Sequence, residues 1–154
     1  MLNIFNEKLK FKDKEISKTI LGTATFTGET YFGHRSRLYE LDLETQPENI
    51  AKIIQKAYDL GVRSINLVNH ENLLKAYDMA CENGVEMDVI ATIGKSNVNY
   101  LMPDYEKAKE VDWLSDINKL SKYNPSIMLI DEFLVNSFDW KYLENMLNQI
   151  NKLN

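Results

Sequence analysis

The sequence of 154 residues contains one cysteine, Cys81, so a disulfide cannot form within one chain. It also lacks the paired cysteines of common structural zinc sites. No apolar run approaches the ~20 residues of a membrane-spanning helix, and residues 1–15 lack the apolar core of a signal peptide. These absences predict a cytoplasmic protein without membrane association, in which Cys81 is a small buried residue on a helix.

The sequence has fewer basic than acidic residues, and among the basic residues arginine is rarer than lysine. The formal net charge of -5 argues against a general role in nucleic-acid binding. Of the 18 Lys and Arg residues, three are arginines, and two of these, Arg35 and Arg37, lie beside His34. A planar guanidinium binds carboxylates and phosphates through two parallel hydrogen bonds, a geometry that lysine cannot copy.

The glycine fingerprint G-x-G-x-x-G is also missing, which disfavours a dinucleotide-binding sheet. The chain instead alternates apolar runs with amphipathic segments. The apolar runs predict strands at 18–26, 63–69, 87–94 and 125–135. The amphipathic segments predict helices at 45–61, 70–84, 110–124 and 138–153.

Residue types at the segment ends predict where the first two helices begin and stop. Thr45 is the expected N-cap of the first helix, Pro47 lies in its first turn, and Gly61 and Gly84 follow the two helices. The third and fourth helices carry apolar stripes that we expect to face inward: Trp113, Leu114, Ile117, Leu120, Trp140, Leu143, Leu147 and Ile150.

Alternation of strands and helices is typical of an α/β fold with a parallel sheet and right-handed crossovers. We therefore expect a single domain over residues 1–154, with an N-terminal β-hairpin at 1–17 and four βα units at 18–154. Four such units do not close a barrel, and they leave two sheet edges exposed. The expected remedies are a homodimer, an open doubly wound sheet, or a missing C-terminal half.

Several motifs resemble the first half of the aldo/keto reductase barrel. The stretch "LKFKDKEISKTILGTATF" is similar to the family's opening hairpin, with a turn at Asp13–Lys14, followed by a first strand that carries Leu21-Gly22-Thr23. The stretch "AKIIQKAYDLGVRSINLVNHENLLKAYDMA" is similar to the next helix, strand and helix, while "VIATIGK" and "SIMLIDEFLVNSFDWKYLENMLNQI" match the third and fourth units loosely. The resemblance implies half of a (β/α)8 (TIM) barrel.

The family's catalytic residues are not matched. Its acid corresponds to Asn66, its tyrosine has no counterpart, its lysine corresponds to Ile93, with Lys95 two residues later, and its histidine corresponds to Asp131. Without the tyrosine and its carboxylate, a carbonyl cannot be protonated in the family's way. The family holds its nicotinamide largely on later strands. The resemblance therefore implies a reductase-like barrel domain with no cofactor and no reductase chemistry.

Working groups in such barrels lie at the carboxyl ends of the strands. Asp131, Lys95 and His70 are the catalytic candidates, because a carboxylate, an amine and an imidazole can each exchange a proton. Adjacent strand residues face opposite sides, so only one of Asp131 and Glu132 can face the rim, and we choose Asp131. The alternatives are that Lys95 is a solvated loop lysine and that His70 caps the second helix.

A metal site is the weaker reading of the same region. His70, Glu71, Asp131 and Glu132 could offer nitrogen and oxygen ligands, but no His-x-x-x-His spacing or third clear ligand supports a metal. We predict none.

The segment 27–46 is too long and too aromatic for an ordinary connection. The predicted binding residues for a small anionic molecule are Arg35, Arg37, His34, Asn66 and Thr23. In the alternative, the arginines pair with Glu29, Glu40 or Asp42 and pin the segment. Since a fold does not fix a function, an assembly module and an enzyme of another reaction class using Asp131 and Lys95 also remain open.

Overall fold

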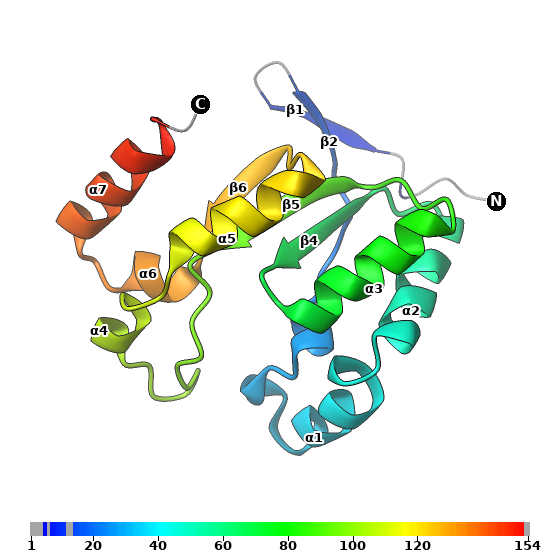
Figure 1. Ribbon diagram of the computed structural model, residues 1–154, viewed down its shortest axis with the longest axis horizontal. Helices are drawn as coiled ribbons and strands as arrows, with labels where there is room; N and C mark the ends of the chain where they lie inside the picture. The colour runs from blue at the N-terminus through cyan, green and yellow to red at the C-terminus, as the bar shows by residue number, and fades with distance from the viewer. Residues whose placement is uncertain (1–4, 6, 12–13, 153–154) are drawn as a thin grey trace.

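The computed structural model describes residues 5, 7–11 and 14–152. The fold is α/β, with a four-stranded parallel sheet and a two-stranded antiparallel hairpin (Figure 1). The strands are β1 (Lys8–Phe11), β2 (Lys14–Ser17), β3 (Ile20–Leu21), β4 (Ser64–Val68), β5 (Asp88–Ile93) and β6 (Ile127–Ile130). The main helices are α2 (Pro47–Asp59), α3 (Glu71–Glu82), α5 (Trp113–Leu120) and α7 (Trp140–Ile150).

Short helical turns lie mostly near the carboxyl ends of the strands. They are η1 (Ala24–Thr27), η2 (Thr30–Arg35), α1 (Ser36–Tyr39), η3 (Glu40–Glu44), α4 (Tyr105–Ala108), η4 (Ser121–Tyr123) and α6 (Glu132–Asn136). The segment 27–46, expected to be unusual for a loop, is thus largely a run of such turns. None of the helices within the described residues is long and apolar enough to cross a membrane.

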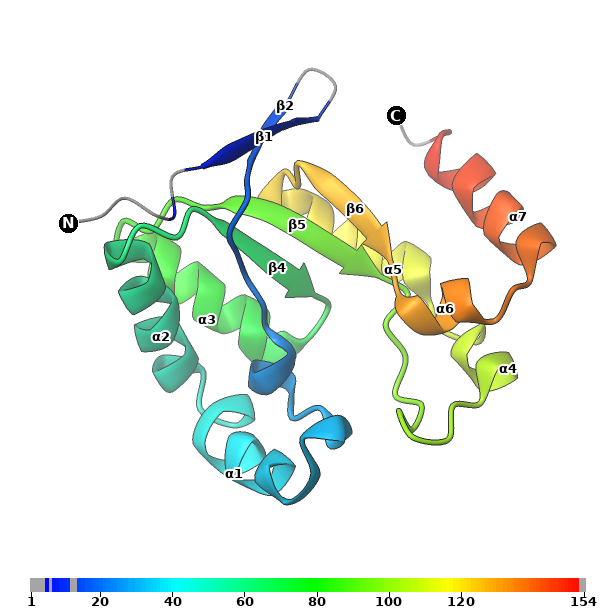
Figure 2. The same ribbon diagram turned by 180° about the vertical axis from the view of Figure 1, so that it is seen from behind.

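The strand order in the parallel sheet is β3-β4-β5-β6, which is also the order along the chain. Each crossover therefore returns the chain to the next position in the sheet. Figure 2 shows α3 and α5 behind the sheet and α2 beside α3, and none of the main helices of the described residues covers the other face. The pairing is in continuous register, with Ser64 opposite Asp88 and Ile90 opposite Ile127.

The core lies between the sheet and these helices. Ile65 and Leu67 of β4 and Ala91 and Ile93 of β5 are fully buried, because alternate strand residues point to the same face. The intervening residues, such as Asn66, point to the face without helices. This face carries both polar residues, such as Asn66 and Thr92, and apolar ones, such as Ile90 and Leu129.

One buried carboxylate ties the ends of the two central strands together. Asp116 of α5 is 5% exposed, and its oxygens accept hydrogen bonds from Asn69 Nδ2 and from the N–H of Gly94, both at 2.7 Å. Asn69 follows β4 and Gly94 follows β5. A single side chain thus joins these two strand ends, in addition to the pairing of β4 with β5.

The hairpin of β1 and β2 lies at the amino ends of the strands (Figures 1 and 2). Ile16 and Ser17 of β2 are buried, and Lys14 Nζ donates to the carbonyl of Ser126, just before β6, at 3.2 Å. The hairpin therefore reaches from one edge strand toward the other. The predicted hairpin is confirmed, while its expected turn includes Asp13, outside the described residues.

The outer strands are shorter than expected. The run 18–26 forms a strand only at Ile20–Leu21, because the carbonyl of Thr23 accepts from Phe26 N and starts the turn η1. The run 125–135 is a strand only as far as Ile130, because Asp131 is the N-cap of α6. In both places, a local side-chain or turn hydrogen bond replaces the sheet pairing.

The predicted helix ends are confirmed at two of three positions. Gly61 and Gly84 follow their helices with φ of 101° and 87°, a conformation that favours glycine. The prediction of Thr45 as N-cap is wrong. Gln46 occupies that position, while Thr45 Oγ1 donates to the carbonyls of Glu40 and Leu41 in the preceding turn.

Some apolar side chains expected in the core are exposed. Leu114 on α5 and Trp140 and Leu147 on α7 are 41%, 66% and 49% exposed, whereas Met146 of α7 is buried. Helix α7 stands beyond β6, the last strand of the sheet (Figure 2). No strand or helix of the described residues therefore packs against its outer side. Cys81, expected to be buried, is also exposed.

The substitution Gly94→Ala tests how tightly the end of β5 is packed. The φ of Gly94 is 78°, and an added Cβ would collide with Cδ1 of the fully buried Leu134. We expect Gly94→Ala to lower the free energy of unfolding in urea by about 2–4 kcal/mol. Gly22→Ala is the matched control, since its Cβ would meet nothing within 4 Å, and it should change stability by less than about 0.5 kcal/mol. Equal losses in both variants would contradict this account.

Candidate functional site

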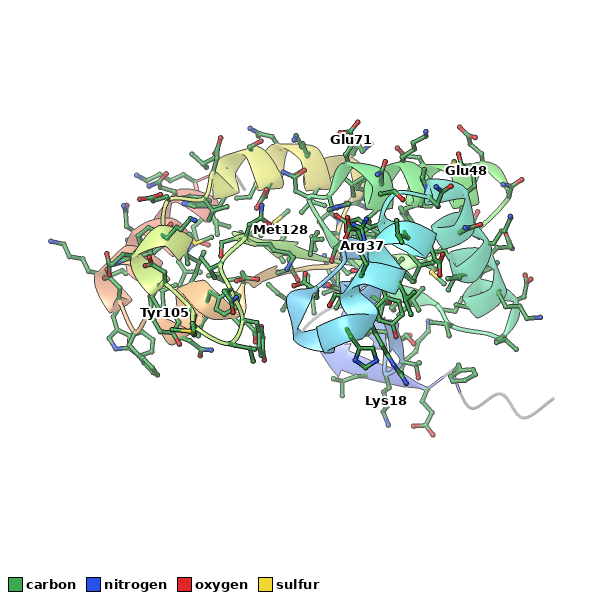
Figure 3. All side chains as sticks on the ribbon, turned by 90° about the horizontal axis from the view of Figure 1, so that it is seen from below. Lys18, Arg37, Glu48, Glu71, Tyr105 and Met128 are labelled. Atoms are coloured by element: carbon green, nitrogen blue, oxygen red, sulfur yellow. The ribbon has the colours of Figure 1, made fainter. Side chains whose placement is uncertain are left out.

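The carboxyl ends of the parallel strands surround a cavity of about 140 Å³. Figure 3 looks onto this end of the sheet, where the segment carrying Arg37 and the helix carrying Tyr105 lie on opposite sides. Four predicted site residues line the cavity: Thr23, Asn66, Lys95 and Asp131. Thr23, Lys95 and Asp131 follow β3, β5 and β6, and Asn66 lies within β4, so the parallel sheet itself brings them together.

Asp131 is the most enclosed ionisable group of this cavity. It is 8% exposed, and its Oδ1 accepts from the N–H of Phe133 at 3.0 Å as the N-cap of α6. Its own N–H donates to the carbonyl of Ile93, which fixes it to the end of β5. Within the described part of the chain, no hydrogen bond reaches the second oxygen, Oδ2.

The surroundings of Asp131 shift its acidity. Burial raises the pKa of this carboxyl to about 6, although the hydrogen bond from Phe133 and the charge of Lys95 act in the opposite direction. The carboxylates of Glu132 and Glu29 raise the pKa further. A group with this pKa can both accept and release a proton near neutral pH.

Lys95 forms an ion pair with Glu29 at the edge of the cavity. The two side chains are 28% and 18% exposed, so the pair is largely shielded from water. Thr27 Oγ1 donates to the same carboxylate of Glu29 at 3.0 Å. Lys95 is therefore not the solvated loop lysine of the alternative interpretation. Sequence reasoning did not identify Glu29 as a site residue, because it offered Glu29 only as a partner for arginine.

Thr23 and Asn66 differ in whether their polar side-chain atoms form hydrogen bonds within the described chain. Asn66 Nδ2 donates to the carbonyl of Ile90 and to Thr92 Oγ1, which holds the amide against β5. Thr23 is 3% exposed, and no hydrogen bond of its hydroxyl is found among the residues that the structure describes. Thr23 thus places a free hydroxyl at the cavity, whereas the Asn66 amide also has a structural role.

His70 lies at a second, adjacent cavity of about 290 Å³ rather than at the first. Its Nε2 is 3.3 Å from Glu44 Oε1, and its buried Nδ1 has no partner in the described residues. His70 occupies the N-cap position of α3, but its side chain makes no capping hydrogen bond. Lys95 and Val68 line both cavities, so they form the boundary between them.

The basic residues of the segment 27–46 lie apart from the cavity. Arg37 forms an ion pair with Glu40, three residues later, as the alternative interpretation expects. Arg35 and His34 are exposed, and none of the three lines the cavity at the strand ends. The anion-binding role of these residues stays a prediction, separate from the cavity.

A larger hollow of about 850 Å³ lies at the opposite end of the sheet, where Ser17 of the hairpin faces Asp88 at the start of β5. Cys81 is on its wall, and burial raises the pKa of the Cys81 thiol. The described residues that line this hollow form no cluster of buried ionisable groups comparable to Asp131 with Lys95. We therefore place the candidate site in the smaller cavity.

Metal binding finds no support in the arrangement of ligands. Among residues 5, 7–11 and 14–152, no three His, Cys, Asp or Glu side chains lie close enough together to hold a metal ion. Asp131 and Glu132 remain near each other, but His70 is directed toward Glu44 instead.

Comparison of the chain with models of known protein families, with curated protein sequences and with solved structures gives no match. The functional argument therefore depends on the geometry of the site.

Asp131→Asn tests the environment of the carboxyl. Because the folded pKa of Asp131 is raised, the folded state binds the proton more tightly, and this group costs stability as pH rises from about 4 through 6. Asparagine keeps the helix cap without ionising. We expect the variant to be about 2–3 kcal/mol more stable than the natural chain at pH 8, and equally stable near pH 4.

Urea unfolding of both proteins at several pH values measures this difference. Asp104→Asn is the control, because Asp104 caps α4 through the N–H of Lys107 at an exposed position outside the cavity. It should show no comparable gain at pH 8. A difference for Asp131→Asn that does not vary with pH would contradict the assignment.

Proposed function

We propose that this chain is half of a (β/α)8-like barrel that binds a small polar molecule at the carboxyl ends of its strands. The observation that carries the proposal is the convergence of Thr23, Lys95 and Asp131 on one cavity, where Asp131 is buried and its Oδ2 accepts no hydrogen bond from the described residues. Asp131 Oδ2 is open to the cavity, so it can accept a hydrogen bond from a molecule bound there.

The arrangement of the elements supports a half-barrel. The strands follow one another in chain order, the crossover helices lie on one face, and the hairpin lies at the amino ends (Figures 1 and 2). Closed barrels of this kind hold their working groups at the carboxyl ends of the strands. The resemblance to the aldo/keto reductases implies the same position for the site.

In the proposed site, Asp131 exchanges a proton with the bound molecule through Oδ2. Its pKa of about 6 keeps both protonation states accessible. The Lys95–Glu29 ion pair lies beside it and carries no net charge. Asn66 stands where the reductases have their acid, and its amide holds Ile90 and Thr92. The proposal therefore contains no reductase step.

A ligand screen followed by amide NMR tests this function. Molecules of about six non-hydrogen atoms fit the cavity, and at least one is expected to shift the amide signals of Lys95 and Phe133. Asp131→Asn should weaken that binding about tenfold or more, because hydrogen bonds to a charged group contribute about 1.5–3 kcal/mol. If no polar molecule of this size shifts these signals, the proposed function is wrong.

A second proposal is assembly through the sheet edges. Ile20 on β3 and Leu129 on β6 are 45% and 46% exposed, and these are the two outer strands of the described sheet. Unpaired edges with apolar side chains attract further strands. A second copy of the chain, or further βα units, would cover them.

Light scattering tests this assembly directly. We expect a molar mass of twice the 17.9 kDa of one chain, and a midpoint of unfolding that rises with protein concentration. Leu129→Glu should shift the protein to the monomer. Leu114→Glu, which changes an exposed leucine on α5 away from the edge, should leave the mass unchanged. A cooperative monomer at all concentrations would exclude self-assembly.

A further inference from the structure

We propose that the ligand of the strand-end cavity is a small organic cation, a primary amine that also carries a hydroxyl group, with its ammonium bound at Asp131 Oδ2. This inference rests on the proposed function and adds the chemical class of the ligand. It is carried by the charges that face the cavity, the two free polar atoms on its wall, and the aromatic rings beside them.

The charges around Asp131 leave an excess of negative charge. The charged groups that face it are Glu29, Lys95 and Glu132. Lys95 and Glu29 neutralise each other in their ion pair, which leaves the carboxylates of Asp131 and Glu132 uncompensated. A buried carboxylate without a cation is unfavourable, so a cationic ligand would be stabilised here and an anionic one repelled.

Two atoms on the cavity wall are available to a ligand. They are Asp131 Oδ2 and Thr23 Oγ1, on residues 8% and 3% exposed, and neither takes part in a hydrogen bond within the described residues. The carboxylate oxygen accepts only, so it matches the donor hydrogens of an ammonium. The hydroxyl of Thr23 both donates and accepts, so it matches a second hydroxyl.

Aromatic rings on the same wall also favour a cation. Tyr100 and Phe133 both line the cavity, and their rings pack edge to face with centroids 5.8 Å apart. The face of an aromatic ring attracts an ammonium group.

The size of the cavity limits the ligand. A volume of about 140 Å³ is close to that of an engineered cavity of about 150 Å³ that holds benzene. A ligand of about six non-hydrogen atoms therefore fits. The guanidinium groups of Arg35 and Arg37, which would favour an anion, do not line this cavity.

Three matched probes separate the possibilities: ethanolamine, ethylene glycol and glycolate. Each has two carbons and one hydroxyl, and the second end is an ammonium, a hydroxyl or a carboxylate. We expect ethanolamine to shift the amide signals of Lys95 and Phe133 with a Kd at least about tenfold below those of the other two. Its affinity should rise as pH increases through about 6, where Asp131 loses its proton.

Variants show whether the two named atoms hold the probe. Asp131→Asn should weaken ethanolamine binding at least about tenfold, and Thr23→Val should weaken it less, since a neutral hydrogen bond is lost. The control Asp104→Asn changes a helix cap outside the cavity and should leave the Kd unchanged.

Each other outcome overturns this inference in a different way. Stronger binding of glycolate or ethylene glycol at the same amides would mean an anionic or neutral ligand, and the proposed site would stand. The same amide shifts from Mg²⁺ or Ca²⁺ alone would mean an inorganic cation. Ethanolamine binding that Asp131→Asn does not weaken would place the probe elsewhere. If no probe and no member of the wider screen shifts these signals, the proposed function fails as well.

Discussion

The geometry of the strand ends depends on the two hydrogen bonds that the Asp116 carboxylate accepts. From α5 it holds Asn69 after β4 and Gly94 after β5. Gly94 directly precedes Lys95, and the carbonyl of the neighbouring Ile93 accepts the N–H of Asp131. The constraint therefore passes from a buried helix residue to both ionisable groups of the candidate site. A satisfied buried network of this kind rigidifies its surroundings, as a binding site requires.

Asp116 and Asp131 show how one type of side chain takes two roles at the same end of the sheet. Both are nearly enclosed, at 5% and 8% exposed. Asp116 has a partner for each oxygen, whereas Asp131 has one for Oδ1 as a helix cap and none for Oδ2 in the described chain. The two residues differ in whether a carboxylate oxygen remains available to a ligand. A carboxylate whose acceptors are all used is structural, and one with a free acceptor beside a cavity is available for chemistry.

The spacing of the apolar residues predicted most helices and strands, because it reflects which side of each element is buried against the rest of the fold. The strand-end rule also placed Thr23, Asn66, Lys95 and Asp131 at one cavity. The rule could not predict contacts between segments that are distant in the sequence. Glu29 reaches Lys95 from a run of turns, and Glu44 holds His70 away at a second cavity. Thr45 is not the N-cap of α2, because its hydroxyl donates to the carbonyls of the preceding turn instead.

The uncovered side of the sheet links assembly to binding in the two proposals. Trp140 and Leu147 of α7, and Leu129 of β6, are exposed where further strands of a barrel would lie. Such strands would also wall in the cavity between β3 and β6, and so remove water from around Asp131. Electrostatic attraction grows as the local dielectric falls, so a cation would be held more tightly in the completed barrel. By linkage, the cation would stabilise the assembly to the same extent.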